Sequence, residues 1–387
     1  MPSHQTILIV SILTPVLLYM LITRFTTSTS SKSPQVPSHD SGRRPAFRQR
    51  LVAVGDLHGD IDNARKVLRM AKIIDTDSRW IGETDILVQT GDIVDRGAHA
   101  NEIYRMMQSL RGQAAGVGGK VVSILGNHEI MNAIGDWRYV TKDDIKAFGG
   151  TKQRQADLSS EGWLGQEWLA NYSVTALVPL SPHPSSPTLS FTHGSLRPSY
   201  SHLTPYPSAI NALGHSLLTK ALTPPLAPPY PPNPYSGLPK GSTHDEAELY
   251  AEGGPLWWRG LADRGEDQVC PWAEELKGKI GARRIIGGHT PNFEKIVARC
   301  NASVIIIDTG ISSAYGGVLS ALEIVYTLTP LDVPKHDGHR QDPLMVSNNV
   351  TITGEELRGR YLEREEVHAI YEKRRKWIAL EEREITL

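Results

Sequence analysis

Three short segments of the sequence carry side chains that bind metal ions and handle phosphate. They begin at residues 55, 91 and 126 and read Gly55-Asp56-Leu57-His58-Gly59, Gly91-Asp92-Ile93-Val94-Asp95-Arg96-Gly97 and Gly126-Asn127-His128-Glu129. Carboxylate and amide oxygens, together with imidazole nitrogen, suit manganese, iron or zinc, and no cysteine is required. Two such ions about 3.5–4 Å apart polarise a phosphoryl group and supply hydroxide at neutral pH. The segments therefore predict a two-metal site for phosphoester hydrolysis.

Four residues of these segments are the predicted metal ligands. Asp56 and His58 stand two residues apart and are expected to bind one ion. Asp92 is expected to bridge both ions, and Asn127 offers an amide oxygen to the other ion. Glycines flank the ligands, because crowded loops need positive φ angles and close backbone approach.

Three more residues of the same segments are predicted to act on the substrate. Arg96 presents a planar, permanently charged fork that fits phosphate oxygens. His128 is adjacent to a predicted ligand and is expected to protonate the leaving oxygen. Asp95 is the carboxylate expected to hold the His128 ring in place.

The elements around the segments are predicted from apolar periodicity. Apolar, β-branched runs at 51–54, 86–88 and 121–125 precede the three segments, so each segment should follow a buried strand. Asp60 is expected to cap the next helix rather than to bind metal. The pattern of strand 51–55, helix 60–72, strand 85–90, helix 98–111 and strand 120–125 is a βαβαβ unit, and further strand-like runs occur at 174–178, 189–192, 285–286, 303–307 and 318–326. Open α/β sheets bind ligands at the carboxyl ends of their strands.

The three segments resemble the signature of the metal-dependent phosphoprotein phosphatases within the calcineurin-like metallophosphoesterase superfamily, and the Shewanella-like branch fits best. The resemblance covers roughly residues 51–325 and implies an α/β (α+β) fold, a two-sheet β-sandwich flanked by helices. It implies two further ligands of the second metal, His193 in Phe191-Thr192-His193-Gly194 and His289 in Ile286-Gly287-Gly288-His289-Thr290. It also implies a second phosphate-binding arginine, Arg259, in Gly254-Pro255-Leu256-Trp257-Trp258-Arg259-Gly260.

Simpler interpretations stay open for the residues whose roles are implied only by the resemblance. His193 and His289 would then be hydrogen-bonded loop histidines. Arg259 would be a surface cation stacked on the neighbouring tryptophans. Tyr315 is a candidate for the edge of the cleft, without a firm correspondence to the family pattern.

Length and composition fit one large α/β domain with extensions. The chain has 387 residues, 40% of them hydrophobic, and a formal net charge of −1. This near-neutral charge argues against nucleic acid as the main partner. Cys270 and Cys300 are the only cysteines and allow one bridge but no disulfide framework.

The N-terminus is predicted to be a single-pass membrane anchor. Residues 6–23 are uncharged and mostly apolar, at the short limit of a transmembrane helix, and a cleaved signal peptide is the alternative. We place the anchor at 1–25 and a disordered, Ser/Thr-rich tether at 26–49. Arg24 and Lys32 favour a cytosolic catalytic domain. A lumenal or extracellular catalytic domain is favoured by N-glycosylation sequons at Asn171, Asn301 and Asn349. Because these two signals disagree, the sequence leaves undetermined on which side of the membrane the catalytic domain lies.

The rest of the chain is divided into a phosphoesterase domain over 50–330, with two insertions, and a C-terminal extension over 331–387. The insertion 134–170 is predicted to be a helical cap with aromatic anchors Trp137, Trp163 and Trp168. The proline-rich insertion 179–240 is expected to be a semi-rigid loop or a docking segment for a partner. An amphipathic helix is predicted within the extension.

These features together predict a membrane-anchored, two-metal phosphomonoesterase, with a phosphoprotein or phosphopeptide as its substrate. Two alternatives are carried. One is a diadenosine-tetraphosphate or pyrophosphate hydrolase, because related enzymes share the metal motifs. The other is a catalytically silent membrane scaffold that binds a partner through the proline-rich loop, although a scaffold has no need of a full set of ligand residues.

Overall fold

The computed structural model describes residues 44–223, 237–332 and 357–387. The predicted membrane anchor lies outside the described residues, as do residues 26–43 of the predicted tether and the proline-rich run 224–236. Within the described ranges, no helix is long and apolar enough to cross a membrane.

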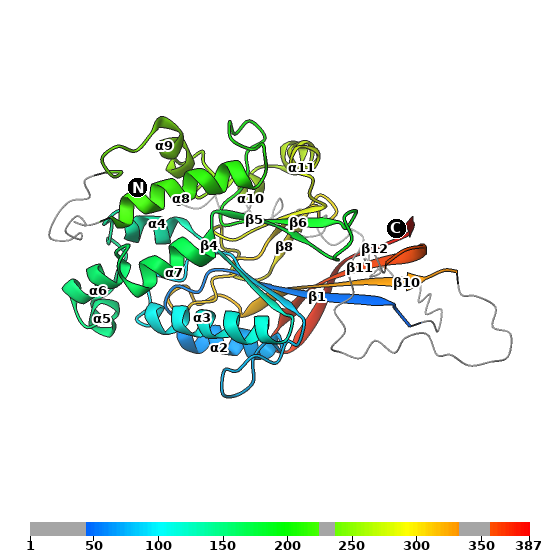
Figure 1. Ribbon diagram of the computed structural model, residues 1–387, viewed down its shortest axis with the longest axis horizontal. Helices are drawn as coiled ribbons and strands as arrows, with labels where there is room; N and C mark the ends of the chain where they lie inside the picture. Colours follow the sequence, from blue (N-terminus) through cyan, green and yellow to red (C-terminus); the bar gives the residue numbers. More distant parts are fainter. Residues whose placement is uncertain (1–43, 224–236, 333–356) are drawn as a thin grey trace, which may run out of the picture. The chain divides into compact units, whose positions relative to one another are not determined.

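Two mixed sheets form the centre of the fold (Figure 1). The strands of the first sheet are β1 (Phe47–Val54), β2 (Ile86–Gln89), β3 (Lys120–Ile124), β4 (Tyr172–Ser173), β10 (Ser320–Pro330), β11 (Arg360–Tyr371) and β12 (Arg374–Thr386). They are ordered β12-β11-β10-β1-β2-β3-β4. The second sheet contains β5 (Thr175–Pro179), β6 (Thr188–Thr192), β7 (Arg284–Gly287), β8 (Val297–Arg299) and β9 (Val304–Ile306). Its order is β5-β6-β7-β9-β8.

The predicted βαβαβ unit is confirmed. β1, α2 (Ile61–Met70), β2, α3 (Ala100–Gly116) and β3 follow one another along the chain, and the three strands pair in parallel. Asp60 caps α2 as predicted, since its carboxylate accepts a hydrogen bond of 3.0 Å from the backbone N–H of Asn63. Parallel strands bring their carboxyl ends to one edge of the sheet, which is where the three motifs begin.

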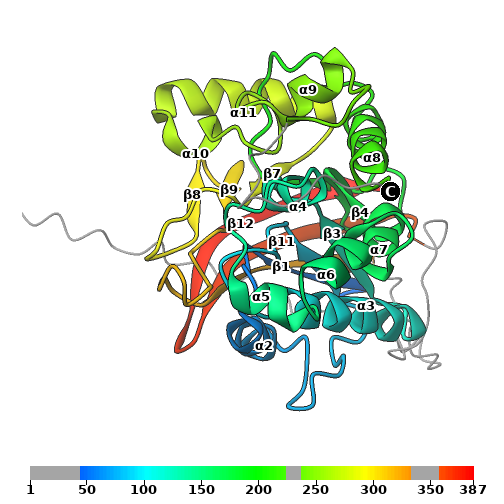
Figure 2. The same cartoon turned by 90° about the vertical axis from the view of Figure 1, so that its left-hand side faces the viewer.

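The side chains of β1 show how the layers are held together. Leu51 and Ala53 point into the core between the two sheets, where Phe191 of the second sheet also lies. Val52 and Val54 point the other way, into the core beneath the helices. α2 and α3 cover the outer face of the first sheet, and α11 (Glu266–Ile280) lies beyond the second sheet (Figures 1 and 2). The predicted two-sheet sandwich flanked by helices is therefore confirmed.

The first insertion is helical, as predicted. It contains α5 (Lys142–Ala147), α6 (Thr151–Leu158) and α7 (Trp163–Asn171), and it follows α4 (Asn127–Ala133). Trp137 and Trp168 are fully buried and anchor it in the core.

The second predicted insertion, 179–240, includes part of the second sheet. β6 lies within these residues, and His193 follows it directly. The same insertion also holds α8 (Ser208–Leu222), and α9 (His244–Tyr250) and α10 (Gly260–Asp263) come after it.

The predicted C-terminal helix is wrong. Residues 360–386 form the hairpin β11–β12, which extends the first sheet beyond β10, so this part of the extension belongs to the phosphoesterase domain. Along β11, buried and less buried positions alternate, and the buried positions include the charged residues Glu363 and Glu365. Arg283 bonds both carboxylates, at 2.7 and 2.6 Å. A half-buried strand is recognised in a sequence by apolar residues at every second position. Because charged residues occupy some of the inward positions of β11, this alternation is not visible in its sequence.

The two cysteines are joined. Cys270 in α11 forms a disulfide with Cys300, which lies in the turn between β8 and β9. The single bridge that the sequence allowed is therefore present.

Candidate metal centre

Loops at the carboxyl ends of five strands bring the predicted ligands together. Asp56 and His58 follow β1, Asp92 follows β2, and Asn127 begins α4 after β3. The second sheet supplies the remaining predicted ligands, His193 after β6 and His289 after β7. All six side chains are at least 95% buried, with exposed fractions of 5% or less. The centre therefore lies where the ends of both sheets meet.

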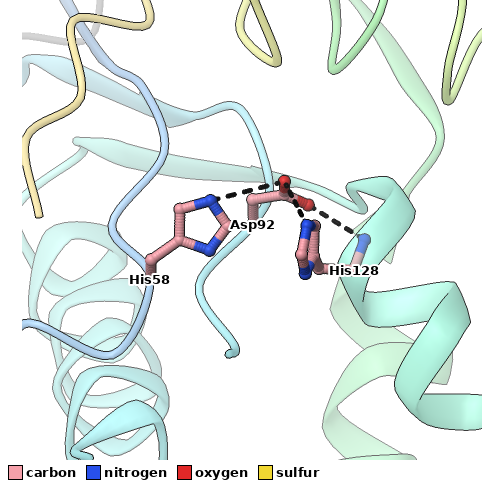
Figure 3. A group of neighbouring side chains, drawn as sticks. All are labelled: His58, Asp92 and His128. Atoms are coloured by element: carbon pink, nitrogen blue, oxygen red, sulfur yellow. Dashed lines mark hydrogen bonds and ion pairs between the residues drawn. The ribbon is translucent and has the colours of Figure 1, made fainter. Parts of the chain in front are cut away.

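Two groups of donor atoms share Asp92. His58, Asp92 and His128 form one group, and Asp92, His193 and His289 form the other, with the donor atoms of each group within 4.8 Å of one another. The Asp92 carboxylate Oδ2 lies 3.7 Å from His58 Nε2 and 3.8 Å from His128 Nε2 (Figure 3). It also lies 3.2 Å from His193 Nε2. Asp92 thus occupies the position expected of a bridging ligand.

Asn127 and Asp56 complete the arrangement. The amide Oδ1 of Asn127 is 2.8 Å from His193 Nε2. Asp56 Oδ1 lies 4.0 Å from His193 Nδ1 and accepts a hydrogen bond of 3.3 Å from the backbone N–H of His289. Both side chains therefore belong to the same cluster.

Backbone carbonyls orient three of the imidazole rings. Nδ1 of His58 lies 2.9 Å from the carbonyl oxygen of Val94, and Nδ1 of His193 lies 2.8 Å from that of Thr90. His289 uses its Nε2 instead, 3.0 Å from the carbonyl oxygen of Trp257. Because a carbonyl only accepts, each ring carries its proton on that nitrogen and turns the lone pair of the other nitrogen toward the centre. Metal-binding histidines are held in this way.

The charges of the cluster fit a cation. Burial raises the pKa of Asp56 well above its usual value, and the nearby carboxylates of Asp308 and Asp92 raise it further. Burial lowers the pKa of His58 to about 4 and that of His289 well below its usual value. Neutral imidazoles, as at His58 and His289, and crowded carboxylates are donors that divalent first-row metals take. The pKa of His193 is instead raised, because the carboxylate of Asp92 outweighs the effect of burial.

The loops hold unusual backbone conformations at the predicted ligands. His58, Asp92 and His289 have φ angles of 42°, 56° and 67°. Side chains other than glycine rarely adopt this region, and strain of this kind clusters at functional sites. Gly126 permits the close approach of the loops, since a Cβ there would lie 2.1 Å from the Asp92 carboxylate.

His128 is paired with Asp95, as the sequence predicted. His128 Nδ1 lies 2.5 Å from Asp95 Oδ2, and the Asp95 side chain is fully buried. Burial alone lowers the pKa of His128, but the carboxylates of Asp92 and Asp95 outweigh it and raise this pKa overall. With Nδ1–H donated to Asp95, Nε2 is the nitrogen that faces the centre.

The two predicted phosphate-binding arginines lie at the edge of the cluster. The guanidinium of Arg96 is stacked between the rings of Tyr139 and Tyr315, 4.7 and 4.9 Å from their centroids. Arg259 donates to the backbone carbonyl of His289 and, at 3.2 Å, to the Thr290 hydroxyl. The Tyr315 ring also lies 5.3 Å from the His58 ring, which places it beside the candidate metal ligands.

Several residues that support the centre had no role predicted from the sequence. Glu129, within the third motif, accepts hydrogen bonds from the backbone N–H groups of Asp92 and Gly126. Its place in the quoted motif was the only local signal. Asn132 donates a hydrogen bond to Asp95, and Arg154 donates one to Asn132. Nothing in the local sequence marks these two residues, because both hydrogen bonds depend on the fold.

Comparisons with known proteins agree with this geometry. The calcineurin-like phosphoesterase family matches residues 49–293. An uncharacterized protein of Schizosaccharomyces pombe is 35% identical over 71% of this chain and 76% of its own length. Shewanella-like protein phosphatase 1 of Plasmodium berghei is 28% identical over 68% of this chain and 67% of its own. The crystal structure of a cold-active protein-tyrosine phosphatase of a psychrophilic Shewanella species superposes with a TM-score of 0.58 at 21% identity, covering 85% of this chain and 80% of that one. The chain therefore belongs to the calcineurin-like phosphoesterase family, as a phosphatase-like hydrolase related to the Shewanella-like protein phosphatases.

Proposed function

We propose that the protein is a metal-dependent phosphatase that hydrolyses phosphate monoesters on proteins. The observation that carries the proposal is the position of Asp92, whose carboxylate is shared by two groups of buried donors. Two divalent ions, manganese, iron or zinc, would supply Lewis acidity and a hydroxide nucleophile at neutral pH. Asp56 and His58 would hold the first ion, with Asp92 shared between the two. The second ion would be held by Asn127, His193 and His289.

His128 is assigned to proton transfer rather than to metal binding. Its Nδ1 is engaged with Asp95 at 2.5 Å, so the ring is fixed and Nε2 presents the proton to the cleft. The raised pKa of His128, which the carboxylates of Asp92 and Asp95 bring about against the effect of burial, favours the protonated ring that a general acid needs.

Arg96 and Arg259 are assigned to the phosphate. Both are permanently charged and fit the oxygens of one terminal phosphate. Tyr139 and Tyr315 stack on Arg96 and limit the motion of its guanidinium. We identify no further basic residue in the motifs that would hold a polyphosphate chain, so a monoester dianion is the better substrate.

Exposed aromatic side chains near Arg96 favour an aryl phosphate. Tyr139 is 39% exposed and Phe293 is 48% exposed, and the Phe293 ring lies 6.1 Å from that of Tyr315. Trp137 and Trp168, in contrast, are buried inside the first insertion and cannot contact a substrate. The structural relative in Shewanella is described as a protein-tyrosine phosphatase. Phosphotyrosine peptides are therefore the expected preference.

A parallel assay tests this proposal. The purified protein with manganese is compared on phosphoserine, phosphothreonine and phosphotyrosine peptides and on diadenosine tetraphosphate. We expect kcat/KM to be at least about tenfold higher on the best phosphopeptide than on the dinucleotide, a difference of about 1.4 kcal/mol in transition-state stabilisation. A dinucleotide that is hydrolysed faster would overturn the phosphoprotein assignment in favour of a polyphosphate hydrolase.

A further inference from the structure

A buried ion pair lies inside the helical insertion, next to the metal centre. Asp144 of α5 and Arg154 of α6 are paired at 2.9 Å, and both side chains are fully buried. The Arg154 guanidinium also lies 4.3 Å from the centroid of the Trp137 ring. A buried pair contributes little stability compared with apolar residues of similar size, so its presence calls for a reason other than stability.

Arg154 is linked to the His128–Asp95 pair by one side chain. Arg154 Nη2 donates a hydrogen bond of 2.8 Å to Oδ1 of Asn132. The Nδ2 group of Asn132 donates to Asp95 Oδ1 at 3.0 Å and to the carbonyl oxygen of His128 at 2.9 Å. Asp95 in turn holds His128 through its other oxygen, Oδ2. An unbroken series of buried hydrogen bonds therefore runs from the insertion to the general acid.

The chemistry of the guanidinium fixes the direction of this series. Arginine donates hydrogen bonds and accepts none, so only the oxygen of the Asn132 amide can face Arg154. The amide nitrogen must then face Asp95. In this orientation Asp95 Oδ1 has a donor, which leaves Oδ2 to accept from the His128 ring.

We propose that Asn132 and Arg154 are positioning residues for the general acid, so that the insertion 134–170 supports proton transfer to the leaving group. This inference rests on the proposed phosphatase function. A second contact from the same insertion agrees with it, because the Tyr139 ring lies 5.2 Å from the His128 ring. The insertion therefore contacts His128 directly and also holds it through Asp95.

Two variants separate this role from a purely structural one. Asp144→Leu/Arg154→Met replaces the buried pair by apolar residues of similar size, a change that folded proteins tolerate. Asn132→Leu removes the link itself and keeps the pair. The matched control is Asp143→Leu/Lys152→Met, which makes the same kinds of change at exposed positions of the same two helices.

The measurement is kcat on two aryl phosphates with different leaving groups. Nitrophenolate leaves without protonation, whereas the phenolate of phenyl phosphate needs the general acid. We expect both variants to lose at least about tenfold in kcat on phenyl phosphate relative to nitrophenyl phosphate, with the control unchanged. Bound metal should match that of the wild type. The melting temperature of both variants should fall, because buried polar groups lose a partner, so kcat is compared at a temperature at which each variant is folded. An equal loss on both substrates, or a loss in Asn132→Leu alone, would overturn the proposal.

A second readout does not depend on activity. In the wild type, the short bond between His128 and Asp95 should give a strongly deshielded Nδ1–H proton signal by NMR, identified by its absence in His128→Gln. The signal should move upfield in both variants and stay in place in the control; an unmoved signal would contradict the link. A wild-type protein that hydrolyses neither aryl phosphate would instead refute the proposed function, and the NMR result would still test the link.

Discussion

The carboxylate of Glu129 is expected to be a main stabilising contact of the metal centre. Its Oε2 accepts hydrogen bonds from the backbone N–H groups of Asp92, at 2.8 Å, and Gly126, at 2.7 Å. Its Oε1 accepts from the N–H groups of Ile93, at 2.8 Å, and Val94, at 3.4 Å, and from the Tyr104 hydroxyl, at 2.7 Å. Glu129 thereby fastens the loop after β2 to the beginning of α4, and these two segments carry Asp92 and Asn127.

The substitution Glu129→Gln keeps the size and shape of the side chain but replaces one carboxylate oxygen by an amide group that only donates. Whichever oxygen is replaced, two backbone N–H groups lose their acceptor inside the protein, because the Tyr104 hydroxyl can turn to accept from the amide. Each buried donor left without a partner costs about 1–3 kcal/mol, so we expect the free energy of unfolding to fall by about 2–6 kcal/mol. Tyr104→Phe removes only one donor and leaves four bonds to Glu129, so its cost should be about 1–3 kcal/mol.

Urea unfolding in the presence of a chelator measures these differences without the contribution of bound metal. The metal content of each variant, measured after reconstitution, should fall in Glu129→Gln and remain normal in Tyr104→Phe. The reasoning fails if Glu129→Gln is no less stable than Tyr104→Phe, or if it binds metal like the wild type.

Four further outcomes are expected. Asp92→Asn should reduce the occupancy of both metal positions together, because one shared carboxylate becomes a neutral amide; full occupancy with normal turnover would refute its bridging role. His128→Ala should retain metal but lose about 10²–10⁴-fold in turnover, with a smaller loss on nitrophenyl phosphate, and an equal loss on all leaving groups would count against a general acid. Burial alone raises the pKa of Glu323, but Arg50 and Arg375 outweigh it and lower this pKa overall. The wild type should therefore be more stable than Glu323→Gln at neutral pH, and this difference in the free energy of unfolding should shrink as the pH falls below about 4.5. Unfolding experiments at a series of acidic pH values measure it. The full chain should sediment with membranes after carbonate extraction, whereas a chain that starts at Arg43 should be soluble. Expression of the full chain that yields a soluble product without its N-terminal segment would favour a cleaved signal peptide.

The sequence by itself was enough to predict the βαβαβ unit and to place the candidate ligands of the first three motifs. Asp56, Asp92 and Asn127 each follow a buried, β-branched run, so short-range patterns were enough to place them at the ends of neighbouring parallel strands. The pairing of His128 with Asp95 was predicted from the residue types of the second and third motifs. His193 and His289 were identified only through the family resemblance, since their place beside the first motifs depends on how the second sheet packs.

Only the tertiary structure decided the contacts between distant segments. Glu363 lies inside the protein because Arg283, far away in the sequence, pairs with it. The segment that was predicted to be a helix is therefore a strand with buried charged residues. Arg154 is buried for a similar reason, since its partners Asn132 and Asp144 lie on two other helices. Periodicity reports which residues are apolar, but a charged residue is buried wherever the fold supplies its partner, and that partner cannot be read from local sequence.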